Sequence, residues 1–298
     1  MLKQKGKLSM KKFIYFFSFL TLLFCGLSFT TTTSAATKHQ LQLFFNSGAK
    51  VYDRNGHPLK SYNNGKPHFS RGAKINYYGD VVYIKNKPYF YIGNGGYILA
   101  VNVAVLNNKT TLSLNHNSYV YDRNGNRIIH FNHDKQKTVL RYEIPINVPG
   151  KLKKVTSQNP FYYVIKNNEK YYLPAKKIKG KYFYYIGNGG YVRAYNVTAI
   201  DNNFNYPKYI SVPLVKREGI KDSFPLFDKN QKLIKKRYHI SPKVKVNSII
   251  NEADRFYFRI QGTNDFIPGD YIKGTYKQMV TKYALSLPYY TDLINLKN

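Results

Sequence analysis

The sequence contains no tryptophan and a single cysteine among 298 residues. The cysteine, Cys25, lies in an apolar run, Phe13–Phe29, which follows five lysines and precedes the small residues Ser34-Ala35-Ala36. This order is typical of a secretory signal peptide over residues 1–36, so the mature chain should begin near Thr37 without a cysteine. Disulfide bonds would then be excluded, and packed cores would have to supply the stability.

Acidic residues and long apolar segments are also scarce. Asp and Glu number 15 against 47 Lys and Arg, which gives a net charge of +32, and loss of the five signal-peptide lysines would leave +27. Such an excess repels itself unless it is matched by a polyanion, and for an exported protein an anionic wall polymer or a membrane surface is favoured over nucleic acid. No second apolar run is long enough to span a membrane, so we expect no transmembrane segment after removal of the signal peptide.

The groups needed for catalysis do not assemble in the sequence. No serine lies in a Gly-x-Ser-x-Gly setting, and the few carboxylates form no convincing pair for glycoside hydrolysis. The one metal-like cluster is His130, His133 and Asp134, for which a solvated histidine pair is the simpler interpretation. The sequence therefore predicts no enzyme activity, no cofactor and no metal.

A repeated glycine-rich stretch organises what is present. Tyr91–Tyr97, with the sequence Tyr-Ile-Gly-Asn-Gly-Gly-Tyr, returns unchanged at Tyr185–Tyr191, 94 positions later. Its flanks, Pro88–Ile92 and Tyr97–Val101, are aromatic and β-branched, which favours strands. The glycines and asparagine between them tolerate positive φ, so each copy predicts a β-hairpin rather than a phosphate-binding loop.

A second signature precedes each hairpin. Val51–Gly56, with the sequence Val-Tyr-Asp-Arg-Asn-Gly, returns at Val120–Gly125 and, weakly, at Leu226–Gln231. It predicts a strand followed by an Asn-Gly turn, in which Asp53 and Asp122 accept hydrogen bonds from turn amides.

These patterns predict an all-β protein built from small antiparallel β modules in series. Each module would be rich in hairpins and would form an SH3-like fold, a small barrel or a small sandwich. The second repeat is longer by about 25 residues between its two signatures, and the extra segment predicts an added hairpin with an Asn-Asn turn. The predicted segments are the signal peptide at 1–36, repeats at 41–106, 111–200 and 209–273, the last of them divergent, and a tail at 274–298 of undecided structure.

Cations and tyrosines recur at equivalent positions of the first two repeats. Lysine pairs with phosphate, and tyrosine packs on sugar or carbon backbones, so this combination suits an anionic polysaccharide or a polyol phosphate. The alternative is a set of solvated lysines that only keep the protein soluble. Leu99 stands where the second repeat has Arg193, so we expect the second repeat to bind more strongly. The predicted ligand-binding residues are Arg54, Lys85, Lys87, Tyr91, Tyr97, Arg123, Lys179, Lys181, Tyr185, Tyr191 and Arg193.

The repeat resembles the carboxy-terminal cell-wall-attachment domain of lactobacillus S-layer proteins, the SLAP family. The family pattern joins a Val-Tyr-Asp-x-x-Gly start to a lysine turn, Tyr-Tyr-x-Ile-Gly and a closing Tyr-Val-x-x-x-Asn-Val. It is similar to Val120–Gly125, Lys179–Lys181 and Tyr184–Val197, and again to Val51–Gly56 and Tyr89–Val103.

The resemblance implies a secreted, non-enzymatic protein of the cell wall or S-layer. It would attach non-covalently to an anionic wall polymer, such as teichoic acid, lipoteichoic acid or a wall polysaccharide. No long assembly region rich in Thr, Ala and Val precedes the repeats, so an accessory wall protein fits better than a lattice-forming one. The alternatives are a secreted wall hydrolase and an adhesin for host glycans, each targeted by the same repeats.

Overall fold

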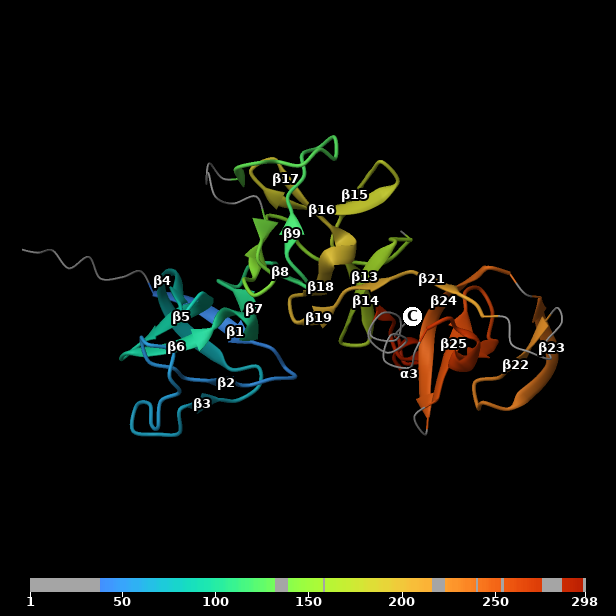
Figure 1. Cartoon of the computed structure of the whole chain (residues 1–298), viewed down its shortest axis with the longest axis horizontal. Coiled ribbons are helices and arrows are strands. Elements are labelled where there is room, and N and C mark those ends of the chain that lie inside the picture. Colours follow the sequence, from blue (N-terminus) through green and yellow to red (C-terminus); the bar gives the residue numbers. More distant parts are fainter. Residues whose placement is uncertain are drawn as a thin grey trace, which may run out of the picture. The chain divides into compact units, whose positions relative to one another are not determined.

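The computed structural model describes residues 38–131, 139–157, 159–215, 223–239, 241–252, 255–274 and 286–296. Lys38–Asn298 form one compact unit. Nearly all regular structure in the described residues is antiparallel strand, which confirms the all-β prediction (Figure 1). The predicted signal peptide lies outside the described residues.

Each sheet in the described part of the chain takes all of its strands from one of three consecutive segments of the sequence. The strands therefore fall into three groups. We call these groups the first, second and third modules. The first module has a five-stranded sheet in the order β6-β5-β4-β1-β7 and a separate β2-β3 pair. Its elements are β1 (Lys38–Leu43), β2 (Ala49–Lys50), β3 (His68–Phe69), β4 (Lys74–Ile84), β5 (Lys87–Gly93), β6 (Gly96–Leu99), the 3-10 helix η1 (Ala100–Asn102) and β7 (Val103–Leu106).

The first glycine-rich hairpin is formed by β5 and β6, with Gly93 opposite Gly96. Asn94 and Gly95 occupy its turn with φ of 46° and 71°, as a type I′ turn requires. The predicted return strand to Val101 is wrong at its end, because β6 stops at Leu99 and a 3-10 turn follows. That turn redirects the chain into β7, which pairs with β1 on the far side of the sheet.

The second module contains three small sheets, β11-β8-β18-β19, β12-β14-β13-β20 and β15-β16-β17, and the pair β10-β9. The predicted added hairpin is confirmed, since β13 and β14 pair across an Asn167-Asn168 turn with φ of 52° and 60°. Its elements are β8 (Thr111–Leu114), β9 (Ser118–Tyr119), β10 (Val139–Leu140), β11 (Ile146–Asn147), β12 (Lys153–Lys154), β13 (Tyr162–Lys166), β14 (Glu169–Tyr172), β15 (Ala175–Ile178), β16 (Lys181–Gly187), β17 (Gly190–Arg193), η3 (Ala194–Asn196), β18 (Val197–Ile200), β19 (Asn203–Phe204) and β20 (Tyr206–Pro207).

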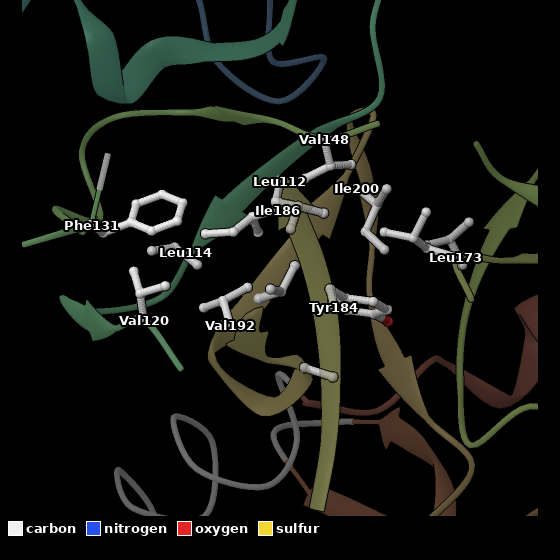
Figure 2. Close-up of a cluster of buried hydrophobic side chains, with 13 residues drawn as sticks. Leu112, Leu114, Val120, Phe131, Val148, Leu173, Tyr184, Ile186, Val192 and Ile200 are labelled. Carbon is white, nitrogen blue, oxygen red and sulfur yellow. The ribbon is translucent and has the colours of Figure 1, made fainter. Parts of the chain in front are cut away.

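The core of the second module gathers side chains from all parts of its length, as Figure 2 shows for Leu112, Tyr184 and Ile200. Tyr184 is fully buried, and its hydroxyl donates to Asn205 Oδ1 at 2.9 Å. Asn205 Nδ2 in turn donates to the carbonyl oxygens of Ala194 and Val197 at 3.2 and 3.1 Å. Asn205 therefore satisfies three buried polar groups beside the 3-10 turn that follows the second glycine-rich hairpin.

The third module is one six-stranded sheet in the order β21-β24-β25-β26-β22-β23. Leu287 is buried in its core, and the Ile249 amide donates to the Pro288 carbonyl, so the segment before α3 belongs to this module. Its elements are β21 (Ile210–Pro213), β22 (Ser223–Phe227), β23 (Leu233–His239), β24 (Lys243–Glu252), β25 (Arg255–Ile260), β26 (Phe266–Pro268), η4 (Gly269–Tyr271) and α3 (Tyr290–Ile294).

The predicted aspartate turns form in all three modules. Asp122 Oδ1 accepts from the amides of Asn124 and Asn126, each at 2.8 Å. Asp53 and Asp228 accept in the same way from the amides two and four positions later. This shared geometry gives the aspartates the structural role that the sequence indicates.

Replacing Asp122 by alanine should lower the midpoint of thermal unfolding, because two turn amides lose their acceptor. Asp122→Asn should lose less, since its side-chain oxygen still accepts. The hydrogen bond from Asn126 is the main reason why the pKa of Asp122 lies below its ordinary value of 3.8. The contribution of the charge is therefore complete above about pH 4 and is lost as the pH falls through the lowered pKa. The unfolding midpoints of wild type and Asp122→Asn should converge as the pH falls through the lowered pKa, and a difference that stays constant with pH would contradict this.

Candidate functional site

The two repeated signatures meet in the folded modules. The backbones of Tyr52 and Tyr97 exchange hydrogen bonds of 2.8 and 2.9 Å, and those of Tyr121 and Tyr191 exchange two of 2.8 Å. Each aspartate turn is thereby held against the glycine-rich hairpin of its own module. The tertiary structure thus joins segments that lie about 40 to 70 residues apart in the sequence.

The four predicted tyrosines form one pair in each hairpin. Tyr91 lies opposite Tyr97 with ring centroids 5.1 Å apart, and Tyr185 lies opposite Tyr191 at the same distance. All four rings are partly or well exposed, and Tyr185 keeps 42% of its surface accessible. The pairs therefore present aromatic surface outside the main cores.

The turn lysines lie against the aspartate turns. Lys85 and Lys179 each open a two-residue turn with φ of 47°. Lys85 Nζ is 3.1 Å from His57 Nε2, and Lys179 Nζ donates to Asn126 Oδ1 at 3.3 Å. In both modules a cation thus bridges from the hairpin to the neighbouring turn.

The other predicted cations are distributed differently in the two modules. Arg54 and Arg123 are exposed at equivalent positions of the aspartate turns, and Lys87 is exposed at the start of β5. In the second module Lys176 adds to them, because its Nζ lies 3.5 Å from the Arg123 carbonyl and 5.8 Å from the centroid of Tyr191. The first module has Val82 at the equivalent position, 94 residues earlier.

Lys181 and Arg193 line a pocket of about 500 Å³ in the second module. The pocket combines residues of β13, β15, β16, β17 and η3 with Phe161, Gly180 and Tyr209, which lie between strands. We call it the aromatic pocket, and no carboxylate lies in its wall. Its lining residues are Phe161, Tyr162, Lys177, Gly180, Lys181, Tyr182, Arg193, Tyr195 and Tyr209.

The aromatic rings of this pocket pack on Phe161. Tyr182 stacks on Phe161 with centroids 4.8 Å apart and planes at 11°, and Tyr209 meets Phe161 edge-on at 5.2 Å. Tyr162 also contacts Phe161 edge-on, and burial raises the pKa of Tyr162 to about 12. Tyr195 is 62% exposed, so its ring is the open one in the wall.

The cations of the aromatic pocket have no anionic partner. Within the described part of the chain, the side chains of Lys177, Lys181 and Arg193 take part in no hydrogen bond or ion pair. Arg193 Nε is buried without an acceptor, while its Cζ lies 5.2 Å from the centroid of Tyr121. Lys177 Nζ lies 5.9 Å from the centroid of Tyr182. Unpaired cations beside aromatic rings suit an anionic ligand with an apolar face.

The sequence predicts Lys181 and Arg193 as ligand-binding residues, and it also offers the Lys176-Lys177 pair as an addition to the second site. The ligand candidates that sequence reasoning missed are the aromatic side chains of the pocket. The added hairpin supplies Phe161 and Tyr162, and its insertion beside the Lys176-Lys177 pair was a signal in the sequence that was interpreted only as structure. The other rings, those of Tyr182, Tyr195 and Tyr209, lie at positions where the repeats do not share an aromatic residue.

A larger cavity of about 920 Å³ contains none of the predicted site residues. Its wall is rich in asparagine, and it includes Asp201, whose pKa is raised by burial. Asp201 already accepts from the Thr111 amide at 2.8 Å. The aromatic pocket is therefore the better candidate for binding an anion.

The described ranges contain neither a cluster of metal ligands nor a membrane-spanning helix. No group of three or more His, Cys, Asp and Glu residues there is placed to hold a metal ion, and His133 and Asp134 lie outside those ranges. No helix there has the length and apolar character needed to span a membrane.

Residues 32–101 match the family model described as the surface layer protein A domain. The match overlaps most of the first repeat, and it confirms for this part of the chain the predicted resemblance to S-layer proteins. It relates the chain to proteins of the cell surface, and it does not extend to the second and third repeats. No curated protein matches the chain.

Proposed function

We propose that this protein is an exported, non-enzymatic cell-wall-binding protein that attaches non-covalently to an anionic wall polymer. The observation that carries the proposal is the set of unpaired cations beside exposed tyrosines in the second module, in a chain with a net charge of +32. A phosphate-bearing polymer such as teichoic or lipoteichoic acid, or an acidic wall polysaccharide, offers charges that repeat along its length. Several modules can then bind one polymer at once, which raises the effective affinity.

The S-layer relationship of the first repeat supports this assignment to the cell surface. We propose that the protein is a constituent of the wall or S-layer that acts beside lattice proteins. Attachment through ionic contacts would let it bind after export, because polymer and cations meet without a covalent step.

The protein from Thr37 onward should sediment with isolated wall sacculi. Its retention should fall as salt rises, because polyanion binding releases counterions and weakens log-linearly with salt. Sacculi stripped of teichoic acid and other polymers should retain much less protein, measured as the bound fraction after centrifugation. Equal retention by stripped and intact sacculi would contradict the proposal that the protein binds an anionic wall polymer.

Two other outcomes would point to the alternative functions. Release of soluble sugar or peptide from the sacculi would indicate a hydrolase. Competition by heparin, without competition by teichoic acid, would indicate an adhesin for sulfated host glycans.

A further inference from the structure

The aromatic pocket has chemical features that a diffuse cationic surface does not need. Its wall contains four phenolic hydroxyl groups, and none of them forms a hydrogen bond within the described ranges of the chain. We propose that this pocket binds a phosphate-substituted pyranose, a sugar ring that carries a phosphate ester. The inference rests on the proposed function in that the sugar phosphate would be a unit of the wall polymer.

The size and polarity of the pocket fit one sugar unit. Its volume of about 500 Å³ lies within the range of about 300–1,000 Å³ that small-ligand pockets occupy. A pyranose has an apolar C–H face and hydroxyl groups around its rim. The exposed ring of Tyr195 can pack on the C–H face, while phenolic hydroxyls both donate to and accept from the hydroxyl groups of the rim.

The charges of the pocket fit a phosphate. Lys177, Lys181 and Arg193 meet without a carboxylate, so an anion would relieve their mutual repulsion. Arg193 also lacks an acceptor at its buried Nε, and a guanidinium group can donate two parallel hydrogen bonds to phosphate oxygens. An uncharged sugar would leave these cations without a partner.

The arrangement of the rings favours a sugar over a nucleotide base. A base needs a free ring face on which to stack. In the pocket, Phe161 and Tyr182 already stack on each other, and Tyr162 and Tyr209 contact Phe161 edge-on. Tyr195 is the open ring, and the edges and hydroxyl groups of the other rings suit a ligand that is bound mainly through its rim.

The first module provides a natural control for this site. Tyr83, Leu99 and Val101 lie 94 positions before Lys177, Arg193 and Tyr195. The strand registers agree with this alignment, since Leu99 pairs with Tyr89 as Arg193 pairs with Phe183. A hairpin of this geometry therefore tolerates the first-module side chains, although it lacks two of the three cations and the open ring.

The test is isothermal titration calorimetry of the chain from Thr37 onward with glucose 1-phosphate, glucose, glycerol 3-phosphate and adenosine monophosphate. Glucose 1-phosphate should bind at least about tenfold more tightly than each of the other three. The triple variant Lys177→Tyr, Arg193→Leu and Tyr195→Val should lose at least about tenfold in this affinity. The double variant Lys232→Ala and Lys235→Ala, at two exposed lysines of the third module that belong to no predicted site, should retain it.

Three results would overturn the inference. Equal affinity for glycerol 3-phosphate would mean that the site recognises charge alone, and tighter binding of adenosine monophosphate would mean that it stacks a base. Unchanged affinity of a folded triple variant would place the sugar phosphate elsewhere. If the triple variant does not fold, Lys177→Tyr at an exposed position is the substitute, and its unchanged affinity would also count against the pocket.

The outcome is separable from that of the proposed function. Failure of the wild-type chain to sediment with sacculi would refute wall attachment, even if glucose 1-phosphate binds. Sedimentation without any glucose 1-phosphate binding would leave wall attachment in place and refute the sugar-phosphate site.

Discussion

Replacing Lys179, Lys181 and Arg193 together by glutamate is expected to release most of the protein from wall sacculi at a salt concentration that still holds the wild type. Lys181 and Arg193 line the aromatic pocket without an anionic partner, and Lys179 lies in the turn beside it. Charge reversal turns attraction to phosphate into repulsion at the centre of the site. We expect binding to weaken by about 10- to 100-fold, measured as the bound fraction against protein concentration.

The matched control reverses Arg54, Lys85 and Lys87 in the first module. Both triple variants change the net charge equally, so non-specific attraction to the wall falls by the same amount in each. The control should lose less affinity, because Leu99 and Val82 replace two of the second-module cations. Equal losses in the two variants, with unchanged circular dichroism, would mean that binding rests on diffuse charge.

Replacing Asn205 by alanine is expected to destabilise the second module by about 3–4 kcal/mol. Asn205 is only 8% exposed, and it accepts from the Tyr184 hydroxyl and donates to the carbonyl groups of Ala194 and Val197. The substitution would leave these three groups buried without a partner and would also create a small cavity. Urea unfolding followed by circular dichroism would measure the change in free energy.

Two neighbouring variants make this prediction specific. Tyr184→Phe removes only one of the three hydrogen bonds and should cost about 1–2 kcal/mol. Asn203→Ala also loses side-chain hydrogen bonds, but Asn203 is partly exposed, so water can replace them and the cost should be smaller. A similar loss for Asn203→Ala and Asn205→Ala would contradict the role assigned to the buried asparagine.

Local sequence patterns were sufficient to predict the hairpins and turns. Asn94-Gly95 and Asn167-Asn168 adopt the positive φ values that a two-residue turn requires, and such residues adopt them at low cost. In the third repeat the sequence predicts a strand at Arg255–Ile260 and a return strand at Phe266–Ile267, and the structure has strands at Arg255–Ile260 and Phe266–Pro268. These features depend on neighbours in the sequence, so the sequence alone reports them.

The end of a strand and the partners of a sheet were harder to predict. The expected strand to Val101 gives way to a 3-10 turn, since the chain must leave the hairpin there to pair with β1. This pairing joins residues about 60 positions apart, and nothing in the local pattern marks it.

The sequence by itself determined the all-β fold class, the repeated sequence motifs and the positions of the recurrent cations and tyrosines. Only the tertiary structure decided which of them share a site. The aromatic pocket collects Phe161, Tyr182, Arg193 and Tyr209 from four separate segments, and Asn205 lies in none of the repeated motifs. The physical reason is that a turn is specified by the backbone preferences of adjacent residues, whereas a pocket is specified by the packing of side chains that are distant in the chain.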